Sequence, residues 1–128
     1  MILEDIEYNV RIETPLYSTE DPIRVKQCLS NIFPYVKWEE TSDMIKGETK
    51  ELEKFKTILE NMQIRDTARS FMKRKTVDNE CKFTLSKQAA CNEKINFSEE
   101  RQPLGGIEVN IESKDLDKLI ETLTDTGE

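Results

Sequence analysis

The chain has 128 residues and a formal net charge of −7, with 36% hydrophobic and 35% charged residues. That length suits one domain with a sizeable buried core. The sequence contains no histidine, which excludes catalytic sites built on a serine–histidine or cysteine–histidine pair and removes the usual metal ligand. The acidic total argues against a protein that coats nucleic acid by bulk charge.

The N-terminus and the apolar stretches predict a cytoplasmic protein without a membrane segment. Residues 1–5 include two acids, whereas a secretory signal begins with basic residues and a long apolar run. The apolar stretches are a few residues long, and a membrane-spanning helix needs roughly 20.

The three cysteines form no Cys-x-x-Cys pair, so neither a redox motif nor a zinc knuckle is predicted. Cys28 lies in a helical apolar pattern and Cys81 in an alternating one. We expect both to be small apolar residues of the core. Cys91 follows no such pattern, and we do not expect it to be reactive.

The first half of the chain predicts a strand, a helix and one or two further strands. Apolar and polar residues alternate over 6–12, and Pro15 ends this strand. Hydroxyls, acids and a proline over 18–22 predict a helix start, and Pro34 stops the helix. The remaining predictions are a strand at 35–38, a turn at 39–43, and at 44–47 a third strand or a resumption of the second.

The second half predicts two helices, three strands and a final helix. Leu52 to Met62 place apolar residues at helical spacing. Asp66 or Thr67 is expected to cap the next helix, which points Ala68, Phe71 and Met72 inward. The later predictions are strands at 81–85, 95–97 and 107–111, a helix or turn at 86–91, a turn at 103–106, a helix at 116–123 capped by Ser113, and a frayed tail at 124–128.

This order favours a single α+β domain over residues 1–128. Strands with one polar face are typical of an antiparallel or mixed sheet with helices packed on the other face. A doubly wound fold fits less well, because the late strands follow one another without helices between them.

The negative net charge conceals a basic segment. Residues 65–87 carry seven basic and three acidic side chains, a net +4, whereas the flanking segments are both acidic. Arg65, Arg69 and Lys73 are spaced to share one face of a helix. Arginine and lysine at such spacing suit the phosphates of a nucleic acid. The alternative is a solvated helix face opposed to acidic neighbours.

Motifs for catalysis or nucleotide binding are absent from the sequence. It contains neither a dinucleotide-binding glycine motif nor a P-loop, and Gly105-Gly106 is its only glycine pair. The paired acids Glu39-Glu40 and Glu99-Glu100 are expected to be solvated. Lys87 could act as a reactive lysine only if it were buried. We therefore expect no enzyme, no cofactor and no metal site.

Seven short strings resemble, in the same order, a small archaeal family of uncharacterised (UPF-type) proteins. They are Thr19-Glu20-Asp21-Pro22, Asn31-Ile32-Phe33-Pro34, Ile45-Lys46-Gly47, Arg65-Asp66-Thr67-Ala68-Arg69, Leu85-Ser86-Lys87-Gln88-Ala89-Ala90, Lys94-Ile95-Asn96-Phe97 and Pro103-Leu104-Gly105. That family is grouped with predicted RNA-binding, exosome-associated-like proteins, and the resemblance spans nearly the whole chain.

The resemblance implies a fold like that of the ribosomal protein L-five, and contact with structured RNA. Together with the basic segment it suggests an RNA-binding set, namely Arg65, Arg69, Lys73, Arg74, Lys75, Lys87, Gln88 and Asn96. Two departures from the family pattern stand out. Cys91-Asn92-Glu93 replaces a small or glycine-containing stretch, and Gly106 replaces a proline.

Two other functions remain open from the sequence. The alternating strands could offer sheet edges to a protein partner or to a second copy of the chain, giving a homodimer without RNA. A small-molecule or enzymatic role could centre on Arg65, Asp66 and Lys87.

Overall fold

The computed structural model of the chain describes residues 3–98 and 105–125. Its elements are η1 (Leu3–Asp5), β1 (Asn9–Pro15), α1 (Pro22–Ile32), β2 (Glu39–Glu40), β3 (Met44–Thr49), α2 (Glu53–Asn61), α3 (Arg65–Arg74), β4 (Thr76–Val77), β5 (Glu80–Leu85), α4 (Lys87–Cys91), β6 (Phe97–Ser98), β7 (Ile107–Glu112) and α5 (Leu116–Leu123). None of the helices among these residues has the length and apolarity needed to cross a membrane.

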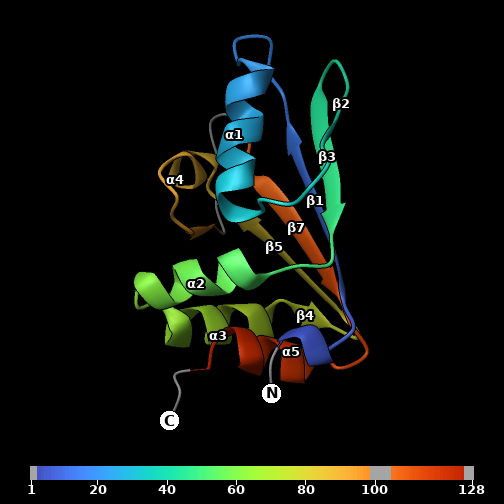
Figure 1. The fold of residues 1–128 in the computed structure, drawn as a ribbon, viewed down its shortest axis with the longest axis vertical. Helices are drawn as coiled ribbons and strands as arrows, with labels where there is room; N and C mark the ends of the chain where they lie inside the picture. The colour runs from blue at the N-terminus through green and yellow to red at the C-terminus, as the bar shows by residue number, and fades with distance from the viewer. Residues whose placement is uncertain (1–2, 99–104, 126–128) are drawn as a thin grey trace.

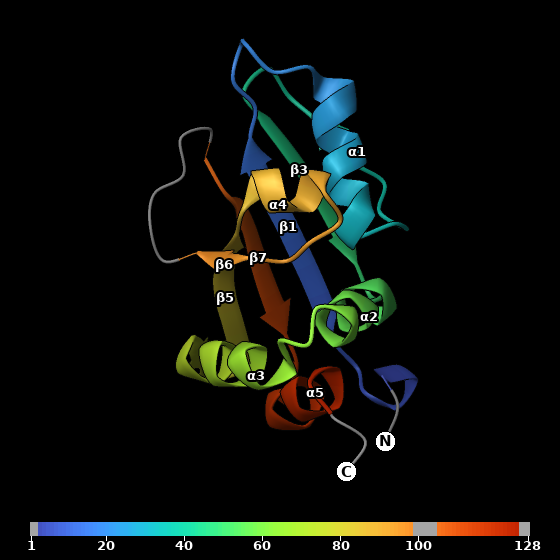
Figure 2. The same cartoon turned by 90° about the vertical axis from the view of Figure 1, so that its left-hand side faces the viewer.

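The strands form one antiparallel sheet in the order β2-β3-β1-β7-β5-β4, and β6 also pairs with β5. The four longest strands, β3, β1, β7 and β5, make its centre. In the first view the helices all lie to one side of the sheet (Figure 1). Turned by 90°, α1, α4, α2 and α3 lie in front of the strands (Figure 2). The expectation of a single α+β domain with helices on one face is confirmed.

The core lies between the sheet and this helical layer. Alternate residues of each central strand are buried there, among them Ile12, Ile45, Phe83 and Val109. Each such side chain contributes about 1.5–3 kcal/mol by leaving water. The predicted inward residues of α3 are buried as well. The period-two and helical apolar patterns thus place the four central strands and α3 correctly.

The helix caps differ from their predictions. The carboxylate of Asp21, and not an earlier hydroxyl, accepts a hydrogen bond from Ile23 N at 3.0 Å and caps α1. Helix α3 begins after Ile64 without a side-chain cap. At α5 the residue in the cap position is Asp115, whose backbone N–H donates to Ser113 Oγ. Several polar residues precede each helix, and their loop geometry decides which one caps it.

The strand predicted at 35–38 does not form. The Trp38 indole donates to Ser30 Oγ at 3.1 Å. A Cβ added to Gly47 would collide with Val36 and would lie 2.7 Å from Trp38. Apolar residues in 35–38 therefore pack over a glycine of β3, and only the following two residues pair as β2.

The chain also has short strands and ends that the sequence pattern did not locate. Strand β4 was not predicted, and β6 begins two residues later than the strand predicted at 95–97. The turn predicted at 103–106 lies partly outside the described residues. Thr124 is buried, so the part of the predicted tail that the structure describes is packed at its start.

Candidate nucleic-acid interface

The predicted basic row on α3 packs against the end of α5. Arg69 Nε donates to Thr124 Oγ1 at 3.0 Å, and Arg69 Nη2 donates to the Thr124 carbonyl at 3.2 Å. Arg65 Nη1 donates to the Asp125 carbonyl, and Lys73 Nζ lies 3.3 Å from Glu121 Oε1. The C-terminal end of a helix carries partial negative charge, which these cations complement. Arg65, Arg69 and Lys73 therefore join two helices.

Arg74 and Lys75 lie apart from that row, around an aromatic pair. Their charged groups lie 5.5 and 5.4 Å from the centroid of the Phe71 ring. This ring in turn lies 4.8 Å from the ring of Phe97 on β6. Asn96 directly precedes Phe97 and is exposed. Three of the predicted residues are thus brought near the junction of α3 and β6.

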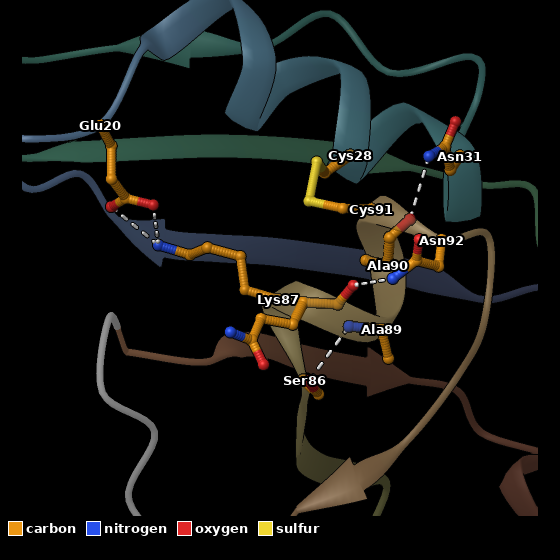
Figure 3. Close-up of a disulfide and its surroundings, with 10 residues drawn as sticks. Glu20, Cys28, Asn31, Ser86, Lys87, Ala89, Ala90, Cys91 and Asn92 are labelled. Carbon is orange, nitrogen blue, oxygen red and sulfur yellow. Dashed lines mark hydrogen bonds and ion pairs between the residues drawn. A yellow bond between two sulfur atoms is a disulfide. The ribbon is translucent and has the colours of Figure 1, made fainter.

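Lys87 is buried at the start of α4. Its Nζ donates to Glu20 Oε1 at 3.1 Å (Figure 3). The same Nζ donates to the Pro15 carbonyl at 2.8 Å. The same Nζ lies 5.8 Å from the centroid of the Tyr17 ring. Only 7% of the lysine side chain is exposed, so the lysine links α4 to the β1–α1 connection and does not reach the surface. Its neighbour Gln88 is exposed.

A disulfide joins α4 to α1 (Figure 3). Cys28 is buried as expected, but it is bonded to Cys91 and is not a simple apolar residue of the core. Asn31 Nδ2 donates to the Ala90 carbonyl at 3.0 Å beside this bond. The two cysteines are 63 positions apart, so their pairing depends on how the helices pack and leaves no local sequence signal.

Cys81 is a free, fully buried thiol on β5. Its sulfur donates to the Met72 carbonyl at 3.3 Å. Burial raises the pKa of the thiol to about 11, and a hydrogen bond with Thr76 lowers it only in part. The prediction that Cys81 is a small residue of the core is therefore confirmed.

The face of the sheet opposite the helices holds a broad groove with a volume of about 1020 Å³. Its walls come from residues that alternate with the core residues on β1, β3, β5 and β7. The cations lining it are Arg11, Lys37, Lys46, Lys75 and Lys82, and the carboxylates are Glu13, Glu39, Glu48, Glu80 and Glu108. We call this surface the open sheet face.

Ion pairs on the open sheet face are long and solvent-exposed. Arg11 Nη2 lies 3.8 Å from carboxylate oxygens of both Glu80 and Glu112, and Lys82 Nζ lies 3.9 Å from Glu80. Exposed pairs of this kind contribute at most about 1 kcal/mol. These cations can therefore exchange their protein partners for an external anion at small cost.

Strand register arranges the charges of the open sheet face in cross-strand rows. Arg11 stands opposite Glu48 on β3 and Asn110 on β7, and Asn110 stands opposite Lys82 on β5. In the next row Glu13 stands between Lys46 and Glu108. Partial burial raises the pKa of Glu108, and the hydrogen-bonded, negatively charged Glu13 raises it further.

The sequence prediction missed the open sheet face. The signal was present as charged residues at every second position of the predicted strands, such as Arg11 with Glu13 and Lys46 with Glu48. The order of the strands, which brings these pairs into one surface, comes from long-range pairing that periodicity does not reveal.

Metal binding has no support from the described side chains. Within residues 3–98 and 105–125 no three cysteine, aspartate or glutamate residues are grouped so as to hold a metal ion.

Comparisons with known proteins place the chain in a family. A family model described as RNA binding matches residues 9–114. A UPF0201 protein of Methanothermobacter thermautotrophicus is 38% identical over 117 residues, which cover 89% of each chain. The crystal structure of a UPF0201 protein from Methanococcus jannaschii superposes with a TM-score of 0.84 at 34% identity, covering 91% of this chain and 98% of the other.

A second solved structure, of an uncharacterised UPF0201 protein, has a TM-score of 0.86 at 26% identity and covers 94% of this chain and 96% of the other. Residues 9–114, which match the family model, contain all the strands from β1 to β7 and therefore the strands that form the open sheet face. The chain belongs to the archaeal UPF0201 family, and the family model that matches it is described as RNA binding.

Proposed function

We propose that the chain binds structured RNA across the open sheet face. The observation that carries this proposal is the groove of about 1020 Å³ with five cationic side chains along it. All five lie within residues 9–114, which match the RNA-binding family model. Helix α5 (Leu116–Leu123), whose C-terminal end receives the basic row of α3, lies beyond that match.

The spacing of the cations suits an extended phosphate backbone. Neighbouring strands lie about 4.8 Å apart, so the three steps from β3 to β5 separate Lys46 from Lys82 by about 14 Å across the sheet, and the register places them one row, about 7 Å, apart along the strands. Two such lysines contact different phosphates. Arg11 stands between them on β1. Contacts of this kind release counterions and supply affinity that depends strongly on salt.

Recognition through backbone shape is favoured over recognition of unstacked bases. Phe83 is the one aromatic residue among those lining the groove, and it is buried. Proteins that hold single-stranded RNA stack its bases on exposed aromatic rings. The proposed ligand is therefore a structured RNA held by its phosphates.

The proposal keeps part of the sequence-predicted set. Lys75 lines the groove, and Arg74 lies beside it over the same phenylalanine ring. Asn96 and Gln88 are exposed but do not line the groove, and Gln88 lies on α4 in the helical layer. The proposed role is binding in the cytoplasm, without a catalytic step or a cofactor.

Matched alanine variants test the proposal. Lys46, Lys75 and Lys82 are replaced together, and a control replaces Lys54, Lys114 and Lys118, which are exposed outside the groove. Affinity for an RNA hairpin is measured over a range of salt concentrations. The groove variant should bind more weakly, and its salt slope should fall by about 3, one for each lost phosphate contact. Equal loss in both variants would show that only net charge matters.

A further inference from the structure

Two carboxylates lie side by side on the open sheet face, where a phosphate backbone would have to pass. Glu13 on β1 and Glu108 on β7 are directly opposed in the strand register, and both line the groove. Directly opposed side chains of neighbouring antiparallel strands have Cβ atoms about 5 Å apart. Two negative charges at that distance repel each other, and both repel a polyanion.

The neighbouring strands place a cation opposite one carboxylate of the pair but not opposite the other. Lys46 on β3 stands opposite Glu13. Thr84 on β5, which carries no charge, stands opposite Glu108 on the other side. The other charged groups of the groove are Arg11 on β1, Glu48 on β3, Glu80 and Lys82 on β5, Glu39 on β2, and Lys37 and Lys75 near the edges. No cation stands opposite Glu108 on β5 or β1, so this carboxyl is the one that gains most from a proton.

We propose that RNA binding on the open sheet face is coupled to proton uptake by the Glu13–Glu108 pair, so that the chain binds RNA more tightly as the pH falls below neutrality. This inference rests on the proposed function and adds its regulation. A proton shared by the pair occupies the hydrogen bond between Glu13 and Glu108 and removes one negative charge from the centre of the groove. The cations around it are unaffected.

The direction of the pH dependence follows from the linkage between proton binding and RNA binding. Bound phosphates add negative charge near the pair, so the complex holds a proton on the pair more strongly than the free chain does. The state that binds more protons is favoured as pH falls. The pKa of Glu108 is already displaced toward neutrality in the free chain, chiefly by burial. RNA displaces it further in the same direction.

The absence of histidine makes this coupling measurable. Between about pH 5.5 and pH 7 histidine is the side chain that ordinarily titrates, and this chain has none. The pKa shifts of Tyr8 and Cys81 lead away from this range, toward higher pH. A change in RNA affinity across this range that is lost in the Glu13→Gln/Glu108→Gln variant therefore reports on the carboxyl pair.

The test measures affinity for an RNA hairpin with a fully base-paired stem, from about pH 7.5 to about pH 5.5 at constant salt. We expect the parent chain to bind more tightly at the lower pH, by at most about tenfold for each unit by which RNA raises the pKa of the pair. The double variant Glu13→Gln/Glu108→Gln should bind more tightly than the parent at pH 7.5 and lose most of the pH dependence.

A matched control variant has the same net charge as the Glu13→Gln/Glu108→Gln variant. Glu53→Gln/Glu60→Gln removes two exposed carboxylates from α2, outside the groove, and should keep the pH dependence of the parent. Binding that is independent of pH in the parent, or equally pH-dependent in the Glu13/Glu108 variant, would overturn the coupling and leave the RNA site intact. No binding by either chain at any pH and low salt would overturn both proposals.

Discussion

Lys87 Nζ lies 3.1 Å from Glu20 Oε1, and the two side chains are only 7% and 9% exposed. The lysine also satisfies the Pro15 carbonyl, at the end of β1. Replacing one member of a buried pair leaves the other charge without compensation. The pair therefore fixes the position of α4 and of the chain entering α1.

Lys87→Met should lower the free energy of unfolding by about 3–5 kcal/mol, because Glu20 keeps a buried charge. The double variant Lys87→Met/Glu20→Gln should recover part of that loss, since neither charge remains. Urea unfolding of the parent, both single variants and the double variant measures this coupling. Additive losses in the double variant would contradict the pair as described.

Arg69 should act on stability and not on RNA affinity. Arg69→Ala removes two hydrogen bonds to Thr124 and should cost about 1–2 kcal/mol of unfolding free energy. Arg24→Ala removes an exposed arginine from α1 and serves as the control, with a loss below about 0.5 kcal/mol. Thermal unfolding measures the stability of each variant, and RNA affinity is titrated well below the melting temperature. A loss of RNA affinity in Arg69→Ala but not in Arg24→Ala would contradict this prediction and would place the RNA interface on α3.

The Cys28–Cys91 bond should stabilise the chain mainly by restricting its unfolded state. Closing a loop of this length is expected to contribute about 2–4 kcal/mol. Cys28→Ser/Cys91→Ser should therefore melt earlier than the oxidised parent, and a reducing agent should lower the melting temperature of the parent alone. If reduction left the melting temperature of the parent unchanged, the bond would contribute nothing in solution.

Local patterns sufficed for the core and for most elements. The alternation of Val10 and Ile12 and the helical spacing of Ala68, Phe71 and Met72 both correspond to buried faces. Local patterns failed where the partner is distant in sequence. The α3 basic row meets Asp125, Lys87 meets Glu20, and Cys28 meets Cys91, and each pairing depends on the packing of separate elements.

The candidate RNA-binding site, too, could be predicted from local sequence patterns only in part. The net charge of residues 65–87 revealed a basic segment. In the structure its cations lie in three environments, because some are on α3, one is on β5 and Lys87 is buried. Lys75 and Lys82 join the open sheet face, while Arg65 and Arg69 join α5. Which strands are neighbours decides which charges share a surface, and that order is set by tertiary pairing.

Cys81 gives the chain a pH-dependent stability on the alkaline side. The pKa of the thiol is about 11 in the folded chain, chiefly because of burial, and about 8.5 when unfolded. The stabilising contribution is complete below about pH 8.5 and is lost as the pH rises toward 11, because the unfolded chain releases the proton first. Burial likewise raises the pKa of Tyr8.

Cys81→Ala should therefore lose less stability than the parent between about pH 8.5 and about pH 11. Thermal unfolding of both chains at several pH values measures the difference in slope, and Tyr8 is common to both. Parallel slopes would show that the thiol ionises equally in the folded and unfolded chains.

The location of the RNA on the open sheet face is tested most directly by backbone amide NMR shifts of the oxidised chain as an RNA hairpin is added at low salt. The largest shifts are expected on the four central strands, at Arg11, Lys46, Lys82 and Asn110. Shifts confined to α3 and α4, with the strands unchanged, would contradict binding across the sheet.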